Sequence, residues 1–357
     1  MSRTVHVVLP GGVDDPAAPS GGNRYDRQVC DGLRRGWQVH EIAVPGSWPR
    51  PSADQRQALG AALTGLPPNS TVLLDGLVAC GVPEILEPLA ARLRLVVLVH
   101  LALGDETGRT PSEAVELRAL ERRTLHAARA VLATSDGAAR RLTELHDLPA
   151  GRVHVAAPGV EPAPLAEPSP DGARLLCVAA VIPRKGQDVL VQALSRCDDL
   201  AWTCVCAGAL DRAPAFTDPL RGGRVQFVGT RTGAALNATY AAADLLVLPS
   251  RAETYGMVVT EALARGVPVL GTAVDGVPEA LGAAPDGTRP GALITPDDPD
   301  ELADALRAWL TDADLRDRWR SAARARRDTL RGWDFTTGRV SDVLAALDRT
   351  ATGKGTR

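Results

Sequence analysis

Two glutamates and the segment between them are the residues of this chain best suited to bind a ligand. Glu253 and Glu261 are separated by seven residues, and a predicted helix begins between them near Gly256 and continues to about Ala264. The N–H groups of Tyr255 to Val258 then lie at a helix N-terminus, where they can bind an anion. The carboxylates can accept hydrogen bonds from hydroxyl groups. The pattern predicts a site for a phosphorylated ligand with hydroxyls. The plainer alternative is one solvated glutamate and one that favours the helix dipole.

A pair of cations offers a second group suited to phosphate. Arg184 and Lys185 precede Gly186 in the sequence. They lie in the turn between a predicted strand, Leu175 to Val181, and a predicted helix, Gln187 to Leu194. A guanidinium and an ammonium group both bind phosphate oxygens, and glycine lets a ligand approach the backbone closely. The alternative is a basic turn that faces solvent.

Short apolar runs predict the buried parallel strands that position these loops. Leu245 to Leu248 precedes the glutamate loop, and Val267 to Leu270 follows its helix. In the first half, Val5 to Leu9, Thr71 to Asp75 and Leu95 to His100 are further strands. They alternate with helical patterns, so the fold class is α/β with doubly wound parallel sheets. His100 ends its strand and therefore lies at the carboxyl edge of the sheet, where ligands bind in such folds. A structural histidine is the alternative.

Length and composition predict two domains. The chain has 357 residues, more than one domain usually contains. The segment Glu161 to Asp171 is rich in Pro, Glu and Ala without an apolar period, which is typical of a linker. We therefore predict a first domain over residues 1–165 and a second over residues 172–335.

The bulk composition disfavours several classes of protein. The chain is 45% hydrophobic with a net charge of −3, which gives no support for nucleic acid as a partner. Apolar runs such as Leu175 to Ile182 are shorter than the ~18 residues of a membrane span, and the first residues lack a signal-peptide layout. Six cysteines without a C-x-x-C pattern, including Cys204 and Cys206, predict core positions and a cytoplasmic setting.

Two further motifs have structural interpretations. Asp298-Pro299-Asp300 has the D-x-D form of a metal–nucleotide signature. We interpret Asp298 as a helix N-cap, with Glu301 completing a capping box, and therefore predict no metal site. The arginine-dense stretch from Arg316 to Arg331 is interpreted as a solvated helix face, and a patch that touches an anionic membrane or an acceptor is the less favoured alternative.

The stretch from Ala243 to Glu279, taken whole, resembles the nucleotide-sugar-binding segment of the family-4 retaining glycosyltransferases of GT-B fold, the glycosyl transferases of group 1. The turn Arg184-Lys185-Gly186 is similar to their R-x-x-K-G region, and Ala157 to Val160 is similar to the turn that closes their first domain. The resemblance covers nearly the whole chain. It implies two Rossmann-like domains that face each other across a cleft, with a last helix at 337–350 crossing back to the first.

The resemblance also implies roles for residues of the second domain. Glu253 would contact donor-sugar hydroxyls, and Glu261 would hold the ribose. Arg184 and Lys185 would bind the donor diphosphate. The remaining donor-binding positions implied in this half of the chain are Gly229, Tyr255, Gly256, Met257 and Val258. The loop after Gly229 would receive the nucleotide base.

In the first domain the resemblance implies a Gly-Gly pair against the donor diphosphate, best matched by Gly21 and Gly22, with Gly11 and Gly12 as a second candidate. A histidine that meets the donor sugar matches His100. Asp105 and Glu106 follow this histidine in the sequence and are candidates for the acceptor side.

Together these features predict a retaining glycosyltransferase that moves a sugar from a nucleoside diphosphate sugar to a hydroxyl acceptor without a metal ion. UDP- and GDP-sugars are the expected donors, and no further cofactor is expected. The acceptor, whether a small molecule, a glycan or a lipid, is left open. The alternatives are a nucleotide-sugar epimerase-like enzyme, a phosphorylase-like enzyme and a non-catalytic binding module of the same fold. The phosphorylase-like alternative would need a pyridoxal-binding lysine, for which the second domain shows no candidate.

Overall fold

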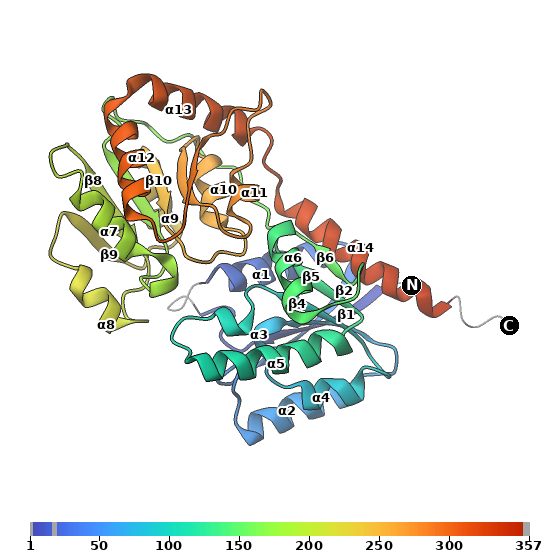
Figure 1. Cartoon of the computed structure of the whole chain (residues 1–357). Coiled ribbons are helices and arrows are strands. Elements are labelled where there is room, and N and C mark those ends of the chain that lie inside the picture. Colours follow the sequence, from blue (N-terminus) through green and yellow to red (C-terminus); the bar gives the residue numbers. More distant parts are fainter. Residues whose placement is uncertain (1–2, 16–19, 353–357) are drawn as a thin grey trace. The chain divides into compact units, whose positions relative to one another are not determined.

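The computed structural model describes residues 3–15 and 20–352, and the chain divides into two compact units (Figure 1). Unit 1 comprises the described residues up to Gly159 together with those from Gly332 onward, and unit 2 comprises Val160–Arg331. Each unit contains one parallel sheet of six strands. This confirms the predicted α/β class with a doubly wound sheet in each half. None of the described helices is long and apolar enough to cross a membrane.

The sheet of unit 1 has the strand order β2-β1-β3-β4-β5-β6. Its strands are β1 (Arg3–Pro10), β2 (Trp37–Val44), β3 (Thr71–Asp75), β4 (Arg94–Val99), β5 (Ala130–Ala133) and β6 (Val153–Val155). Its helices are α1 (Gly21–Leu33), α2 (Ala53–Thr64), α3 (Gly76–Ala79), α4 (Pro83–Leu86), α5 (Pro111–Ala127), α6 (Asp136–His146) and α14 (Trp333–Thr352). The order reverses between β1 and β3, so the carboxyl ends of these strands form the expected ligand-binding edge.

Side chains on alternate positions of the unit 1 strands pack against different helices. One core joins the strands to apolar residues of α2, α4, α5 and α6. Because successive side chains of a strand point to opposite faces, the remaining strand residues face the other side, where α1 and α14 pack together. Side-chain caps fix several helix starts: Ser20 Oγ accepts a hydrogen bond from Asn23 N at the start of α1, and Ser135 Oγ accepts one from Ala138 N at the start of α6.

The sheet of unit 2 has the strand order β12-β11-β10-β7-β8-β9. Its strands are β7 (Arg174–Val178), β8 (Thr203–Ala207), β9 (Val225–Gly229), β10 (Leu245–Leu248), β11 (Val269–Thr272) and β12 (Gly291–Ile294). Its helices are α7 (Gln187–Ser195), α8 (Pro214–Thr217), α9 (Gly233–Ala241), α10 (Met257–Leu263), α11 (Val277–Leu281), α12 (Pro299–Thr311) and α13 (Ala313–Arg327). Helices α7 and α12 share a core with the sheet. The order reverses between β7 and β10, which is the switch point of a Rossmann-like sheet.

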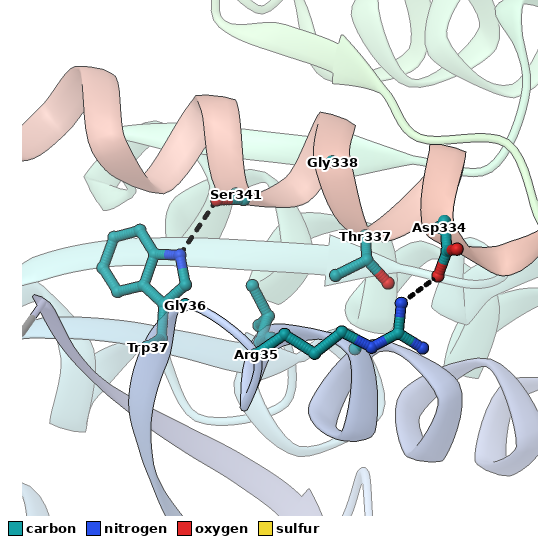
Figure 2. A pocket seen from close by; sticks show the side chains of 9 residues that line it. Arg35, Gly36, Trp37, Asp334, Thr337, Gly338 and Ser341 are labelled. Carbon is teal, nitrogen blue, oxygen red and sulfur yellow. Dashed lines mark hydrogen bonds and ion pairs between the residues drawn. The ribbon is translucent and has the colours of Figure 1, made fainter.

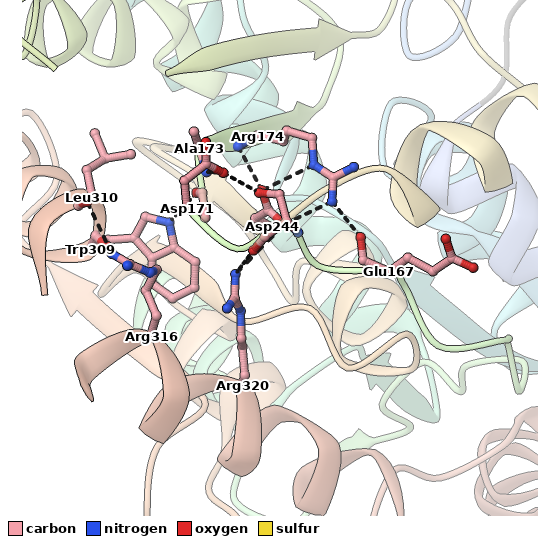
Figure 3. Close-up of polar contacts among 11 residues, drawn as sticks. Glu167, Asp171, Ala173, Arg174, Asp244, Trp309, Leu310, Arg316 and Arg320 are labelled. Carbon is pink, nitrogen blue, oxygen red and sulfur yellow. Dashed lines mark hydrogen bonds and ion pairs between the residues drawn. The ribbon is translucent and has the colours of Figure 1, made fainter. Parts of the chain in front are cut away.

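The segment interpreted as a linker, residues 161–171, is irregular but hydrogen-bonded to unit 2. Asp244, a fully buried carboxylate just before β10, accepts hydrogen bonds from Ser169 N at 2.6 Å and Ser169 Oγ at 2.5 Å. It also accepts hydrogen bonds from the backbone and guanidinium of Arg174, and Arg320 lies beside it, as Figure 3 shows. The segment therefore belongs to the packed structure of unit 2.

The interpretation of residues 316–331 as a solvated helix face holds for Arg318, Arg324 and Arg331, which are exposed, but is wrong for other arginines of the stretch. Arg316 is buried, and its Nη1 donates to two carbonyls at the end of α12 (Figure 3). Arg320 and Arg327 donate to carbonyls of Ser169 and Ala163. The physical reason is that α13 borders backbone carbonyls without helical or strand partners, and a guanidinium supplies several donors on a long apolar stem.

The D-x-D segment caps a helix, as predicted, although one detail differs. Asp298 accepts hydrogen bonds from the backbone N–H groups of Asp300 and Glu301 at 3.0 and 2.8 Å, so it is the N-cap of α12. The predicted capping box is wrong, because the Glu301 carboxylate accepts from Thr295 N instead. The six cysteines are all free and buried, as predicted for core positions.

Candidate active site

The predicted phosphate turn and the predicted glutamate loop meet at the switch point of unit 2. The turn 183–186 follows β7, and the loop 249–256 follows β10, its neighbour in the sheet. Arg251 N donates to Arg184 O at 2.8 Å, and Arg184 Nη1 donates to Ala252 O at 3.1 Å. Gly186 has a φ of +68°, and a Cβ there would lie 2.0 Å from Pro249 O. Only glycine therefore allows the two loops to approach this closely.

Lys185 and Glu253 form an ion pair between the two loops. Lys185 Nζ donates to Glu253 Oε2, and the two side chains are 15% and 13% exposed. The cation predicted to bind phosphate and the carboxylate predicted to bind sugar hydroxyls are thus in direct contact. Arg184 Nε is buried and has no hydrogen-bond partner within residues 3–15 and 20–352. The switch point therefore holds an unused donor next to a paired cation and carboxylate.

Arg251 holds the phosphate turn in place and was missed in the sequence. Its guanidinium donates to both carboxylate oxygens of Asp188, at 2.9 and 2.7 Å, and to the carbonyl of Pro183. Asp297 accepts a further hydrogen bond from Arg251 Nε. A bidentate arginine–carboxylate pair fixes orientation as well as distance. The sequence could have indicated this ion pair, because Arg251 lies two residues before Glu253 and Asp188 lies in the first turn of α7, directly after the phosphate turn.

Glu261 lies in α10 and is almost completely buried, with 8% of its surface exposed. Its Oε2 accepts a hydrogen bond at 2.8 Å from the phenol of Tyr240, at the end of α9. Arg265 lies over the Tyr240 ring and donates to Glu261 O. Tyr240 therefore orients one oxygen of Glu261, a role that sequence spacing did not reveal.

The other predicted donor-binding residues of unit 2 lie around these groups. Gly256 is the N-cap of α10 with a φ of +85°, a conformation that favours glycine. Met257 and Val258 begin this helix and are half-buried. Burial and the charge of Glu279 raise the pKa of Tyr255 to about 12, so this phenol stays protonated. Gly229 ends β9 with a φ of +73°.

His100 follows β4 in unit 1, at the carboxyl edge of the sheet, as predicted. Its Nε2 lies 2.8 Å from Asp26 Oδ1 and 3.7 Å from Asp75 Oδ2. Burial alone would lower the pKa of His100, but the charge of Asp26, its hydrogen bond and the charge of Asp75 raise it to about 9. Sequence reasoning missed both aspartates. Asp75, the last residue of β3, could have been found, because β3 and β4 end at the same edge.

Gly22 and Tyr25 of α1 flank the His100 ring. A Cβ on Gly22 would lie 3.1 Å from His100 Cδ2, and the Tyr25 ring meets the imidazole edge-on at 5.2 Å. Gly21 is the first residue of α1 and is exposed. Gly22 thus packs beside the predicted histidine. The resemblance had implied that this glycine contacts the donor diphosphate. Of the second candidates, Gly11 packs against the backbone of Pro45.

The predicted acceptor residue Asp105 is engaged by two arginines. Its carboxylate accepts a hydrogen bond from Arg118 at 3.2 Å and from Arg141 Nη2 at 2.6 Å, and only 11% of its side chain is exposed. These contacts anchor the loop after β4 to α5 and α6. Within the part of the chain that the structure describes, Asp105 therefore has a structural role.

Among the residues that the structure describes, one group of side chains has ligand atoms close enough together to suggest a metal ion. The potential ligand atoms of Asp26, Asp75 and His100 all lie within 4.8 Å of one another. The 2.8 Å distance between Asp26 and the His100 ring is that of a hydrogen bond, so we interpret the group as a hydrogen-bonded cluster. The D-x-D segment is occupied by helix capping, as described above.

A cavity of about 220 Å³ lies elsewhere in unit 1 and contains none of the predicted site residues. Its lining comes from the end of α1, the start of β2 and α14, where Trp37 Nε1 donates to Ser341 and Arg35 pairs with Asp334 (Figure 2). A Cβ on Gly32 would lie 2.2 Å from Thr337 Oγ1, so the neighbouring helices pack very closely. We interpret the cavity as a packing gap beneath α14.

Comparison with known proteins identifies the family. A family model described as "Glycosyl transferases group 1" matches residues 172–312. A D-inositol 3-phosphate glycosyltransferase of Jonesia denitrificans is 30% identical over 298 residues, which cover 73% of this chain and 68% of that protein. A protein of the same name from Xylanimonas cellulosilytica is 30% identical over 251 residues, 63% of this chain and 58% of that one.

Solved structures show the same fold. Sucrose-phosphate synthase of Thermosynechococcus elongatus matches 98% of this chain and 100% of its own, with a TM-score of 0.77 and 20% identity. HepE of Anabaena, solved with UDP-glucose, matches 96% of this chain and 99% of its own, with a TM-score of 0.74 and 18% identity. The sequence similarity extends over most of the chain, and the protein therefore belongs to the group 1 glycosyl transferases and is a glycosyltransferase of GT-B fold.

Proposed function

We propose that the protein transfers a sugar from a nucleoside diphosphate sugar to a hydroxyl group, with retention of configuration and without a metal ion. The observation that carries this proposal is the meeting of Arg184, Lys185 and Glu253 at the switch point of unit 2, with Glu261 in the adjoining helix. HepE of Anabaena was solved with UDP-glucose, which supports a UDP-sugar as the first donor to test, followed by a GDP-sugar.

The two cations would stabilise the leaving group. A departing nucleoside diphosphate gains negative charge in the transition state, and cations already in place stabilise it without reorganisation. Arg184 has an unused buried Nε, and the position of Lys185 is fixed by its neighbours. Such fixed charges can replace a divalent ion, which is why we propose a metal-independent reaction.

The carboxylates would recognise hydroxyl groups of the donor. When a diphosphate binds Lys185, the ammonium no longer has to neutralise Glu253, whose oxygens then accept hydrogen bonds from the sugar. Glu261, with one oxygen held by Tyr240, would accept from the ribose. Ribose contacts act equally in the ground and transition states and so mainly affect binding. His100 of unit 1 is proposed to contact the donor sugar.

The test is to substitute Lys185 with alanine. We expect turnover to fall about a hundredfold or more, as for other groups that stabilise developing charge. Arg196→Ala, an exposed cation of the same unit, is the matched control and should keep wild-type turnover. A chelator should leave the wild-type rate unchanged. Activity that disappears with EDTA and returns with magnesium or manganese would overturn the metal-independent mechanism.

Ligand screens identify the substrates. UDP-, GDP- and ADP-sugars should be compared by thermal shift, since a ligand of the native state raises its melting temperature. D-inositol 3-phosphate is the first acceptor to test, because the similar proteins carry it in their names. NMR of the product should show the donor's anomeric configuration. Donor binding without transfer to any acceptor would favour the binding-module alternative, and an altered donor sugar would favour the epimerase alternative.

We also propose a cytoplasmic location, because all six cysteines are free thiols.

A further inference from the structure

His100 and two buried aspartates form a polar cluster within unit 1, in which the His100 side chain is 21% exposed. Asp26, from the second turn of α1, is 3% exposed, and Asp75, at the end of β3, is 5% exposed. Asp26 Oδ1 contacts His100 Nε2 at 2.8 Å, and Asp75 Oδ2 lies 3.7 Å from the same nitrogen. Within residues 3–15 and 20–352, the titratable groups facing the ring are these two carboxyls and the phenol of Tyr25, which donates to Ala156 O.

The hydrogen bonds of the two carboxyl groups are incomplete if both are ionised. Asp75 Oδ1 accepts a hydrogen bond from Leu77 N at 2.6 Å, as the N-cap of α3. Asp26 Oδ2 is buried and has no donor within residues 3–15 and 20–352. An unsatisfied buried carboxylate oxygen is costly, and two buried carboxylates side by side repel each other. One proton between them would remove both penalties.

We propose that Asp75 is a neutral carboxylic acid that donates a hydrogen bond to Asp26, and that the single charge of this pair orients His100 and keeps its ring protonated. Asp26 and Asp75 are then positioning residues, since both act through the histidine. The cluster in this state holds one imidazolium, one carboxylate and one carboxylic acid, so its charges cancel. A neutral cluster is far less costly to bury than one with a net charge.

The shifts in proton affinity agree with this assignment. Burial, followed by the charge of Asp26, raises the pKa of Asp75 to about 8, despite the opposing charge of His100. A hydrogen bond between the two carboxyls contributes in the same direction. The imidazole, with a pKa near 9, is protonated over the same range. At neutral pH the proton therefore resides on Asp75, and Asp26 pairs with the imidazolium.

This arrangement has a consequence for ligand binding that rests on the proposed function. Because Nε2 is engaged by Asp26, Nδ1 is the ring nitrogen that would contact a sugar hydroxyl. A protonated ring makes Nδ1 a donor, so the hydroxyl accepts the hydrogen bond. Charge-assisted hydrogen bonds are about twice as strong as neutral ones. The cluster thus converts a histidine that could act as a base into a fixed donor.

The first test is an NMR titration of His100 in the wild-type protein, assigned by comparison with His100→Gln. It requires neither donor nor acceptor, so its outcome is separate from that of the proposed function. We expect the ring to titrate with a pKa of about 9, well above the ordinary value of 6.5. A His100 ring that is neutral at pH 7.5 would overturn the proposal without any further variant.

Asparagine variants distinguish the two aspartates. Asp26→Asn should lower the pKa of His100 by more than one unit, because it removes the charge. Asp75→Asn should lower that pKa by a smaller amount, because Asp75 is neutral at pH 7 and its charge acts on His100 only above its own pKa of about 8. Asp31→Asn, an exposed position of α1 paired with Arg34, is the matched control and should change nothing. Equal effects of Asp26→Asn and Asp75→Asn would show two ionised carboxylates and refute the proton assignment.

A metal titration and the kinetics complete the test. Substoichiometric Mn²⁺ should leave the His100 resonances sharp, whereas selective broadening would make the cluster a metal site and overturn the proposal.

In donor turnover, Asp26→Asn should lower kcat and move the alkaline limb of the pH profile to lower pH. Asp75→Asn should move this limb less than Asp26→Asn does. A fall in stability without a change in the profile would identify Asp26 as merely structural.

Discussion

Arg251 lies outside the residues that would touch the donor, yet its replacement by lysine should weaken nucleotide binding. The guanidinium joins the glutamate loop to Asp188 by two hydrogen bonds and to the carbonyl of Pro183. The turn that contains Arg184 and Lys185 is thus held from both sides. Lysine keeps the charge but cannot reproduce a bidentate fork.

The size of the effect follows from the exposure of the pair. Buried hydrogen bonds to charged groups contribute about 1.5–3 kcal/mol each, and exposed ion pairs contribute about 0.2–1 kcal/mol. Arg251 and Asp188 are 29% and 25% exposed, which places each bond between these limits. Lysine should retain one bond to Asp188, so the net loss is about 1–2 kcal/mol. If binding has to restore the order of the turn, the Kd for nucleotide rises about five- to thirtyfold.

Isothermal titration with UDP and GDP measures this change directly, and Arg307→Lys provides the matched control. Arg307 makes an equivalent bidentate pair with Asp199, at 2.7 Å for both bonds, away from the switch point of the same unit. Its replacement should alter stability slightly and nucleotide affinity not at all. Equal Kd values for wild-type protein and Arg251→Lys, measured with a nucleotide that binds the wild type, would refute the idea that Arg251 pre-organises the phosphate turn.

Four further predictions concern other residues of the chain. Glu253→Ala should abolish transfer while changing nucleotide affinity only a few fold, and Glu261→Ala should mainly raise the KM for donor; steady-state kinetics with titration calorimetry would detect the opposite pattern. Asp244→Ala should lower the free energy of unfolding by about 3 kcal/mol, because it leaves buried donors unpaired; unchanged urea unfolding would exclude this role. Stability should fall as pH rises from about 6.5 to 9, because the raised pKa values of His100 and Asp75 mean that the folded state binds more protons than the unfolded chain in that range. Thermal melts across this range that show no decline would contradict those shifts.

The alternation of strands and helices could be predicted because each strand of these parallel sheets is a continuous apolar run. Thr71–Asp75 was predicted with the bounds that the structure has. The predicted start of the last helix at Thr337 is wrong, since α14 begins at Trp333. The order of the strands was not predictable, because periodicity records burial and not which strand lies beside which. It is this order that brings the turn after β7 beside the loop after β10.

The candidate site could be predicted as a set of residues but not as a set of contacts. Residue type and spacing identified Lys185, Glu253 and Glu261, since each has a chemical reason to follow a buried strand. Nothing in the spacing revealed that Lys185 pairs with Glu253, or that Tyr240 holds Glu261. The error over the arginines of α13 has the same origin. An arginine-rich helix is polar by composition, and only the position of unpaired carbonyls decides which guanidinium groups are buried.

Lys185, Glu253 and Glu261 already have partners within the protein, and this constrains how a donor can bind. A buried charge without a partner is costly, so Lys185 rests on Glu253 when no ligand is bound. Sugar hydroxyls are neutral and cannot displace the ammonium from Glu253 on their own. In the proposed function a diphosphate would do so, because it offers Lys185 and Arg184 a more highly charged anion. Glu253 would then be free to accept hydrogen bonds from the sugar hydroxyls of the same donor. It follows that the free sugar should bind weakly, and that the nucleotide portion of the donor should govern access to the sugar site.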